Sequence, residues 1–169
     1  MSDLQAIADR VEIEALRAEF TDASMMHDWD RFASLFTQDG AWRMPHIDEE
    51  LVSREKIRAG VERLRSLWEF FVQTVHPGTI QLDGDTAVGR SYIEEFGRFQ
   101  GKSFLNYSLY HDRYQRTPDG WKFAERTYEI RYLDTTPLAG SPPLAAETPA
   151  NPEGARPRQP EPKDERHVR

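Results

Sequence analysis

The sequence "HPGTIQLDGDTAVGRSYIEE" (residues 76–95) predicts two β-strands joined by a tight turn. Asp83-Gly84 lies between two runs rich in β-branched and apolar residues, and Asp-Gly is a strong hairpin signal. Residues 104–134 predict two more strands, with a turn at Pro118-Asp119-Gly120. We therefore expect an antiparallel meander in the second half of the folded chain.

Three helices are predicted before this meander. Apolar residues recur at helical spacing over residues 4–23, so we expect a long amphipathic helix that starts at a capping box on Ser2 and ends near residue 27. Asp28 is the expected N-cap of a short second helix, and Ser53 that of a third. Residues 41–47 predict a strand whose proline places it at a strand end or edge. Helices followed by a meander are typical of the α+β class, with helices on one face of a curved sheet.

The C-terminal segment differs in composition from the rest. Eight of the 11 prolines lie from Pro137 onward, and from Ser141 five acidic residues balance five basic ones. Such a segment cannot bury enough apolar surface to offset its ordering entropy. We expect residues 1–140 to form one domain, which carries the net charge of −7, and residues 141–169 to form a disordered, proline-rich charged tail.

The composition excludes several classes of function. The chain has no cysteine, which removes thiol nucleophiles and thiolate metal sites and favours the cytoplasm. The negative net charge makes nucleic acid a poor partner, and no apolar run is long enough to span a membrane. The sequence contains neither a nucleotide-binding motif nor histidines at metal-ligand spacing, so no cofactor and no metal are expected.

Three stretches resemble one known family. They are "HDWDRFASLFTQDGAWRM" (27–44), the hairpin sequence above, and "YHDRYQRTPDGWKFAERTYEIRYLDTTPLAG" (110–140). Together they span about residues 5–140 and are similar to the SnoaL-like branch of the NTF2-like superfamily. The resemblance implies a cone: three N-terminal helices packed on a curved, mixed but mostly antiparallel sheet that encloses a pocket. It also implies a small-molecule ligand and a homodimer or homotrimer, while the fold alone does not choose between enzymes and non-catalytic subunits.

His76 is the first candidate catalytic residue. It matches a histidine that removes a proton in the dehydratase and dehydrochlorinase members, and histidine exchanges protons near neutral pH. The alternative is a histidine that is merely hydrogen-bonded at the end of a strand. The aspartate that orients this histidine in those relatives is replaced here by Met25. Asp22 lies one turn earlier and is the substitute partner, unless it is an ordinary surface residue.

Two further charged residues are expected to act in the cavity. Glu94 and Glu95 are neighbours on a strand, so only one of them can point inward. Glu95 matches an aspartate of a dehydratase relative and is the expected cavity acid. Arg131 matches an arginine of the same relative and is expected to hold an anionic group. The alternative for these residues is a role in solvated or structural ion pairs.

The residues expected to contact the substrate are aromatic or flexible and apolar: Phe20, Met25, Trp42, Tyr107 and Tyr110. A phenol in an apolar cavity can hydrogen-bond a carbonyl or stabilise an oxyanion. The alternative for each of these residues is simple core packing.

Two functional hypotheses follow. The first is a cofactor-independent acid–base enzyme, a dehydratase or other lyase or an isomerase or cyclase, that acts on a small, mostly apolar organic molecule. The second is a non-catalytic ligand-binding module, or a subunit resembling the β chain of a ring-hydroxylating dioxygenase.

Overall fold

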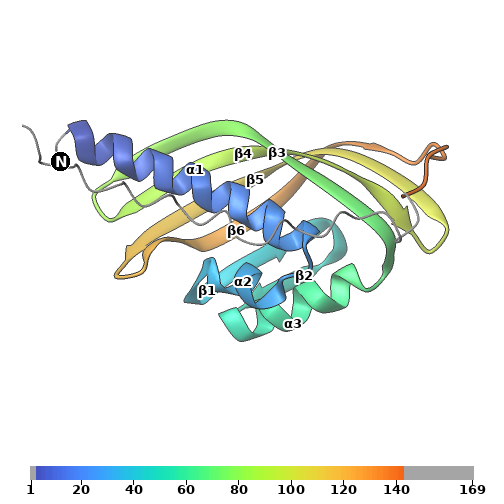
Figure 1. Ribbon diagram of the computed structural model, residues 1–169, viewed down its shortest axis with the longest axis horizontal. Helices are drawn as coiled ribbons and strands as arrows, with labels where there is room; N and C mark the ends of the chain where they lie inside the picture. Colours follow the sequence, from blue (N-terminus) through green and yellow to red (C-terminus); the bar gives the residue numbers. More distant parts are fainter. Residues whose placement is uncertain (1–2, 143–169) are drawn as a thin grey trace, which may run out of the picture. The chain divides into compact units, whose positions relative to one another are not determined.

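The computed structural model describes residues 3–142, which form three α-helices, a short 3₁₀ helix and six strands. Figure 1 shows the long strands of residues 68–134 curving past the helices, which lie on one side of the sheet. The elements are α1 (Asp3–Met25), α2 (Trp29–Ser34), β1 (Phe36–Met44), η1 (Pro45–Ile47), β2 (Glu49–Val52), α3 (Arg54–Arg65), β3 (Trp68–Asp83), β4 (Thr86–Phe99), β5 (Lys102–Thr117) and β6 (Gly120–Asp134).

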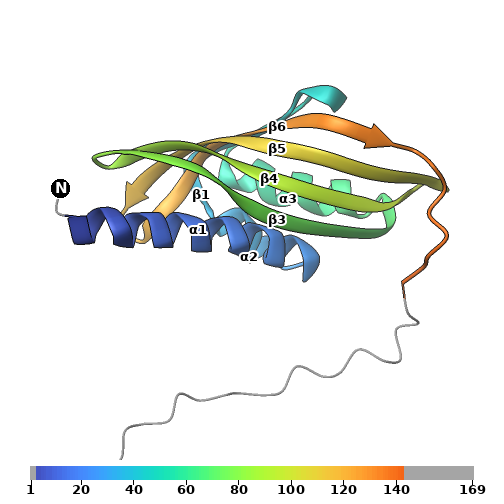
Figure 2. The same ribbon diagram turned by 90° about the horizontal axis from the view of Figure 1, so that it is seen from above.

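The strands form one open sheet in the order β2-β1-β6-β5-β4-β3. Neighbouring strands from β3 to β6 are antiparallel, whereas β1 runs parallel to β6, so the sheet is mixed. The hairpins predicted at Asp83-Gly84 and Pro118-Asp119-Gly120 are confirmed as the β3–β4 and β5–β6 connections. Figure 2 shows the long strands as one twisted layer with α1 alongside. The α+β fold expected from the sequence is therefore present.

Two of the predicted helix caps are confirmed. The Asp28 side chain accepts a hydrogen bond from the Arg31 amide at 3.1 Å, and Ser53 Oγ accepts one from the Lys56 amide at 3.3 Å. The third predicted cap, Ser2, lies outside the described residues. β1 and β2 come before the third helix. β1 ends at Met44, directly before Pro45, so the strand end expected at this proline is confirmed, and Pro45 begins η1.

The apolar stripe predicted for the first helix is wrong in its first three turns. Leu4, Ile7 and Val11 are exposed, whereas Asp9 and Ile13 on the opposite side are buried. The reason is polar: Asp9 accepts hydrogen bonds from Arg116 at 2.6 Å and from the Trp121 indole at 3.2 Å, which turns this side of α1 toward the sheet. A buried, multiply bonded carboxylate thus determines the orientation of the helix end.

The core lies between the helices and the concave face of the sheet. Phe20 and Phe32 from α1 and α2 pack with Phe36, Trp42 and Phe123 from the strands. One compact unit ends at Ala139, and the tail expected over residues 141–169 lies outside the described residues except for its first two positions. In residues 3–142, no helix is both long and apolar enough to cross a membrane.

Candidate functional site

A pocket of about 420 Å³ opens on the concave side of the sheet. Side chains from β1, η1, β2 and α3 face it from one side, and side chains from β3 to β6 face it from the other. Its volume lies within the range of about 300–1,000 Å³ found for small-molecule sites. The curved sheet thus encloses the pocket that the resemblance implied.

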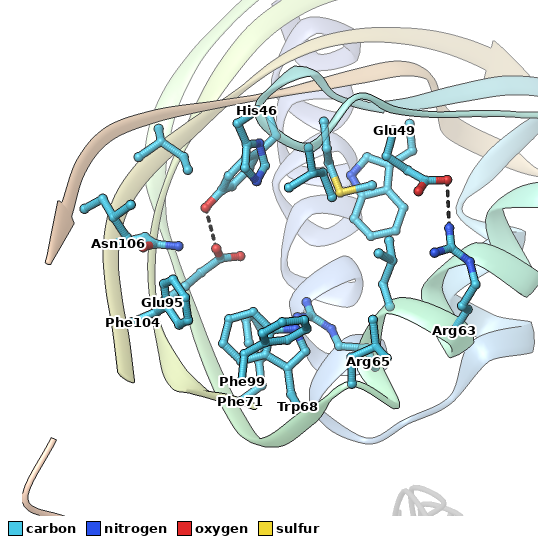
Figure 3. Close-up of a pocket in the computed structure, with 18 of the residues that line it drawn as sticks. His46, Glu49, Arg63, Arg65, Trp68, Phe71, Glu95, Phe99, Phe104 and Asn106 are labelled. Atoms are coloured by element: carbon cyan, nitrogen blue, oxygen red, sulfur yellow. Dashed lines mark hydrogen bonds and ion pairs between the residues drawn. The ribbon is translucent and has the colours of Figure 1, made fainter. Parts of the chain in front are cut away.

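One wall of the pocket is aromatic. The Trp68 ring contacts Phe71, Phe99 and Phe104 with centroid distances of 5.2, 5.6 and 5.8 Å. Figure 3 shows these four rings gathered at one end of the pocket. Edge-to-face contacts of this kind hold the rings in place and present a flat apolar surface to a ligand.

The Glu95 carboxylate faces this wall from the middle of β4 (Figure 3). The residue is only 8% exposed. Gln73 Nε2 donates to Oε1 at 2.6 Å, and the Tyr128 hydroxyl donates to Oε2. Thr21 on α1 donates to the Gln73 side-chain oxygen at 3.0 Å, so the Gln73 amide group is oriented with its nitrogen toward the carboxylate. The two donors fix the direction of the carboxylate.

The sheet register explains why these groups meet. Gln73 on β3, Glu95 on β4 and Asn106 on β5 are direct cross-strand partners, so their side chains form one row on the concave face. Asn106 is buried, and its Oδ1 atom forms no hydrogen bond within residues 3–142. Its amide nitrogen points into the pocket in Figure 3. The amide is therefore available to a ligand next to Glu95.

Two tyrosines lie further along the same concave face. Tyr110 and Tyr128 are cross-strand partners on β5 and β6, and both are buried pocket residues. Burial, followed by the negative charge of Glu95, raises the pKa of both phenols well above the ordinary range. Both hydroxyls therefore stay protonated. Tyr128 donates to Glu95, whereas no acceptor within residues 3–142 takes the Tyr110 proton, so Tyr110 can donate to a ligand.

His46 on η1 lies across the pocket from this carboxylate. Its ring is 5.1 Å from that of Tyr128, and Figure 3 shows it above Glu95. Burial lowers the pKa of His46, and the charge of Glu95 opposes this effect without cancelling it. His46 is therefore neutral at pH 7 and can accept a proton there.

Arg65, the last residue of α3, brings a cation to the pocket. Its Nε donates to Ser24 Oγ at 3.1 Å, and its guanidinium carbon lies 3.4 Å from the centre of the Phe71 ring. No carboxylate within residues 3–142 forms an ion pair with it. Burial lowers the pKa of this guanidinium and the charge of Glu95 raises it, but arginine remains protonated in proteins.

The structure places His76 outside the pocket, which corrects the expectation that it lines the cavity. The side chain is 53% exposed, and its Nε2 lies 3.8 Å from a Glu94 oxygen. Alternation along β3 explains this position, because Gln73 and Val75 point inward and His76 points to the convex face. The expectation that only one of the two neighbouring glutamates enters the cavity is confirmed, with Glu95 inside and Glu94 outside.

Three other expected site residues also lie away from the pocket. Asp22 is exposed and forms an ion pair with Arg31 at the surface of α1. Arg131 is exposed and pairs with Glu129 at 3.0 Å. Tyr107 is exposed on the convex face and donates to Glu94 at 3.3 Å. Their strand or helix positions direct these side chains outward, so the structure does not bring them to the pocket.

The remaining expected residues lie in or behind the pocket. Trp42 and Tyr110 line it, as expected. Phe20 is fully buried and packs against both rings at 5.9 and 5.5 Å, so it supports the wall without lining it. Met25 is half-buried, and its sulfur accepts a hydrogen bond from the backbone N–H of Gln73 at 3.3 Å, which places it beside the residue that holds Glu95.

A buried ion pair supports the pocket from below. Arg126 forms two hydrogen bonds with Asp112, at 2.8 and 3.2 Å, and both side chains are fully buried. Its guanidinium carbon lies 4.2 Å from the centre of the Phe20 ring and 4.0 Å from that of Tyr110. The pair fixes Phe20, which packs behind the pocket, and Tyr110, which lines it.

The sequence reasoning missed several pocket residues, among them His46, Arg65, Asn106 and Tyr128. Arg65 continues the buried i, i+4 series of Ile57 and Val61, so helical spacing could have found it. Asn106 shares strand parity with Tyr110 and could have been found by alternation. Only the register places Tyr128 beside Tyr110, and only the course of η1 brings in His46.

The polar side chains of the pocket are better suited to bind an organic molecule than a metal ion. Within residues 3–142, no group of three histidine, aspartate or glutamate side chains is placed to hold a metal ion. The polar side chains that line the pocket instead include two carboxylates, Glu49 and Glu95, two guanidiniums, Arg63 and Arg65, one imidazole, one amide and two phenols.

Comparison with known proteins identifies the family of this chain. A family model described as a SnoaL-like domain matches residues 5–127, and the chain therefore belongs to the SnoaL-like family. The gamma-hexachlorocyclohexane dehydrochlorinase of Sphingobium indicum is 29% identical over 148 residues, which cover 83% of this chain and 90% of the relative.

Solved structures show the same fold. The hexachlorocyclohexane dehydrochlorinase LinA-type3 of Novosphingobium barchaimii matches with a TM-score of 0.75 at 24% identity, over 84% of this chain and all of that chain. A candidate scytalone dehydratase from Novosphingobium aromaticivorans matches with a TM-score of 0.70 at 17% identity, over 86% of this chain and 98% of that chain. The fold is the NTF2-like α+β fold.

Proposed function

We propose that this protein is a cofactor-independent acid–base enzyme, a lyase or isomerase, that acts on a small, largely apolar cyclic molecule in the pocket. The observation that carries the proposal is the Glu95 carboxylate, held by Gln73 and Tyr128 at the centre of an aromatic pocket. A carboxylate that is fixed by donors and shielded from bulk water is suited to remove a proton from carbon.

In the proposed reaction, Glu95 accepts the proton of a substrate C–H bond. The electron pair of that bond then forms a carbon–carbon double bond. In an elimination a neighbouring substituent leaves with its own bonding pair, whereas in an isomerisation the proton returns at another carbon. The Tyr110 hydroxyl, which stays protonated, donates to a substrate oxygen on which negative charge develops. The neutral His46 imidazole faces Glu95 across the pocket and relays the proton to water.

The names of the relatives support the class of reaction. The curated relative is a dehydrochlorinase, and such an elimination begins with removal of a proton from carbon. The position of the acid–base groups differs from the sequence-based expectation, because the base is a glutamate of β4 instead of His76 of β3.

The experiment compares two neighbouring glutamates. Cyclohexane derivatives with chloro, hydroxyl or keto substituents, gamma-hexachlorocyclohexane included, are incubated in D₂O, and deuterium uptake and leaving-group release are measured. Glu95→Gln should lower the turnover rate by about 10²–10⁴-fold, the usual contribution of a general base. Glu94→Gln, on the convex face, should leave the rate unchanged. Full activity in Glu95→Gln would refute the proposal, and a loss confined to His76→Ala would return the chemistry to β3.

The second candidate is a non-catalytic ligand-binding module. The observation that favours it is the separation of His76 and Asp22, which the structure places in different surface ion pairs. Tight binding of a ligand with neither deuterium uptake nor group release by the wild-type protein would support this candidate.

A further inference from the structure

The unpaired cation in the pocket carries an inference about the substrate. Arg65 makes one hydrogen bond through Nε and stacks on Phe71, but its two terminal nitrogens form no hydrogen bond within residues 3–142. In Figure 3 the guanidinium points into the pocket beside Trp68. A guanidinium that faces a largely apolar cavity with free N–H groups is a site for an oxygen anion.

Neighbouring charges do not neutralise this cation. Arg63, the other arginine at the pocket, pairs with Glu49 at 2.8 Å and is about half exposed. Glu95 influences Arg65 electrostatically, but it forms no ion pair with it and its two oxygens already accept from Gln73 and Tyr128. The pocket thus presents a guanidinium and a carboxylate that form no ion pair with each other.

We propose that the pocket binds an aromatic or cyclic carboxylic acid, whose carboxylate is held by the two terminal nitrogens of Arg65 and whose ring lies against Trp68 and Phe104. The inference rests on the proposed function for the role of Glu95, and it adds the class of substrate. With its carboxylate on Arg65, the substrate directs the carbon atoms of its ring toward the Glu95 carboxylate.

Geometry and charge favour a carboxylate over a phosphate. A planar guanidinium with two free nitrogens matches the two oxygens of a carboxylate in a bidentate pair. One negative charge balances the one free cation, whereas a phosphate ester carries about two charges and would repel the nearby Glu95. The four aromatic rings of the wall provide stacking surface for a planar ligand.

The test uses 2-naphthoate and its neutral isostere 2-naphthamide as probes, with affinities measured by isothermal titration calorimetry. The wild-type protein should bind 2-naphthoate about tenfold or more tightly than 2-naphthamide, because a charge-assisted bidentate pair is lost with the amide. Arg65→Met should reduce this ratio to near one, and Arg65→Lys should retain part of it. Arg63→Met is the matched control and should keep the wild-type ratio.

Several outcomes would overturn the inference. They are equal binding of the two probes by the wild-type protein, the absence of 2-naphthoate binding, and an unchanged ratio in Arg65→Met. If Arg65→Met does not fold, the ratio of the affinities for 2-naphthoate and 2-naphthamide in the wild type and in Arg65→Lys still tests the inference. Glu95→Gln should bind 2-naphthoate at least as tightly as the wild type, because it removes a negative charge. Failure of the acid–base proposal would therefore appear in turnover and leave this binding ratio intact.

Discussion

Two adjacent glutamates on β4, Glu94 and Glu95, point to opposite faces of the sheet. Glu95 points to the concave face and accepts hydrogen bonds from Gln73 and Tyr128 in the pocket. Glu94 points to the convex face, where it contacts His76 and Tyr107. The two side chains are identical, and the difference in function that we propose comes only from the face on which each lies.

At this scale His46 gives a pH prediction. Burial lowers its pKa, so the neutral form is favoured in the folded protein. Its contribution to stability is present above the ordinary histidine pKa and is lost as the pH falls through the lowered value. We expect an NMR titration of His46 to show a midpoint below the ordinary value, and turnover to decline on acidification through the same range.

Glu95→Gln provides the control for this titration. The Glu95 charge raises the pKa of His46, so its removal should lower the midpoint further. A midpoint at or above the ordinary histidine value in the wild-type protein would contradict the pocket environment described here.

At the scale of the element, α1 shows that polar anchors can override an apolar stripe. Leu4, Ile7 and Val11 follow helical spacing, yet they face outward because Asp9 and Arg17 on other sides of the helix bond to the sheet. Arg17 donates to the Tyr114 hydroxyl at 2.7 Å and to the Thr79 carbonyl oxygen at 2.8 Å. These bonds hold α1, and therefore Thr21, in the position that orients Gln73.

Asp9 gives the prediction for this element. Hydrogen bonding from Arg116 lowers the pKa of Asp9 to about 2. Asp9→Asn should lower the free energy of unfolding by about 3 kcal/mol, because Arg116 and Trp121 lose a charged acceptor. The measurement is urea unfolding at pH 7, with Glu12→Gln, an exposed change on the same helix, as the control.

The Asp9 carboxylate also predicts how the stability of the protein changes at acidic pH. A lowered pKa means that the contribution of Asp9 is present above the ordinary aspartate value and is lost as the pH falls toward 2. The difference in stability between the wild type and Asp9→Asn should therefore shrink over this range. A constant difference would show that Asp9 acts through packing and not through its charge.

At the scale of the whole molecule, the convex face of the sheet is the surface to explain. Tyr92, Tyr107 and Tyr132 are all about half exposed there, and the last two are cross-strand partners with rings 6.2 Å apart. Exposed aromatic side chains of this kind are enriched at association surfaces. We propose that the homodimer or homotrimer expected from the sequence forms through this face.

Light scattering tests the proposal on association. We expect the wild-type protein to have the mass of two or three chains, and Tyr107→Glu to shift it toward one chain, because a charge would be buried at the interface. Leu4→Glu, which alters an exposed apolar residue of α1, should leave the mass unchanged. A monomeric wild type, or dissociation by the α1 variant alone, would contradict an interface on the sheet.

Much of this architecture could be predicted from local signals. The two hairpin turns, the caps Asp28 and Ser53, and the inward parity of Glu95 and Tyr110 depend on residues that are close in sequence. Turn geometry, capping and alternation act over a few residues, so a single sequence contains them.

Which residues line the pocket depends on the tertiary structure. The resemblance placed a base at His76, but the parity of β3 turns that residue outward and Gln73 inward. Tyr128 reaches Glu95 only through the pairing of β4, β5 and β6, and His46 and Arg65 reach the pocket only through the course of η1 and the packing of α3. The sequence by itself determined the elements and the class of fold, because those follow from short-range propensities. Which charged groups share the cavity depends on register and packing between distant segments, and only the tertiary structure decided it.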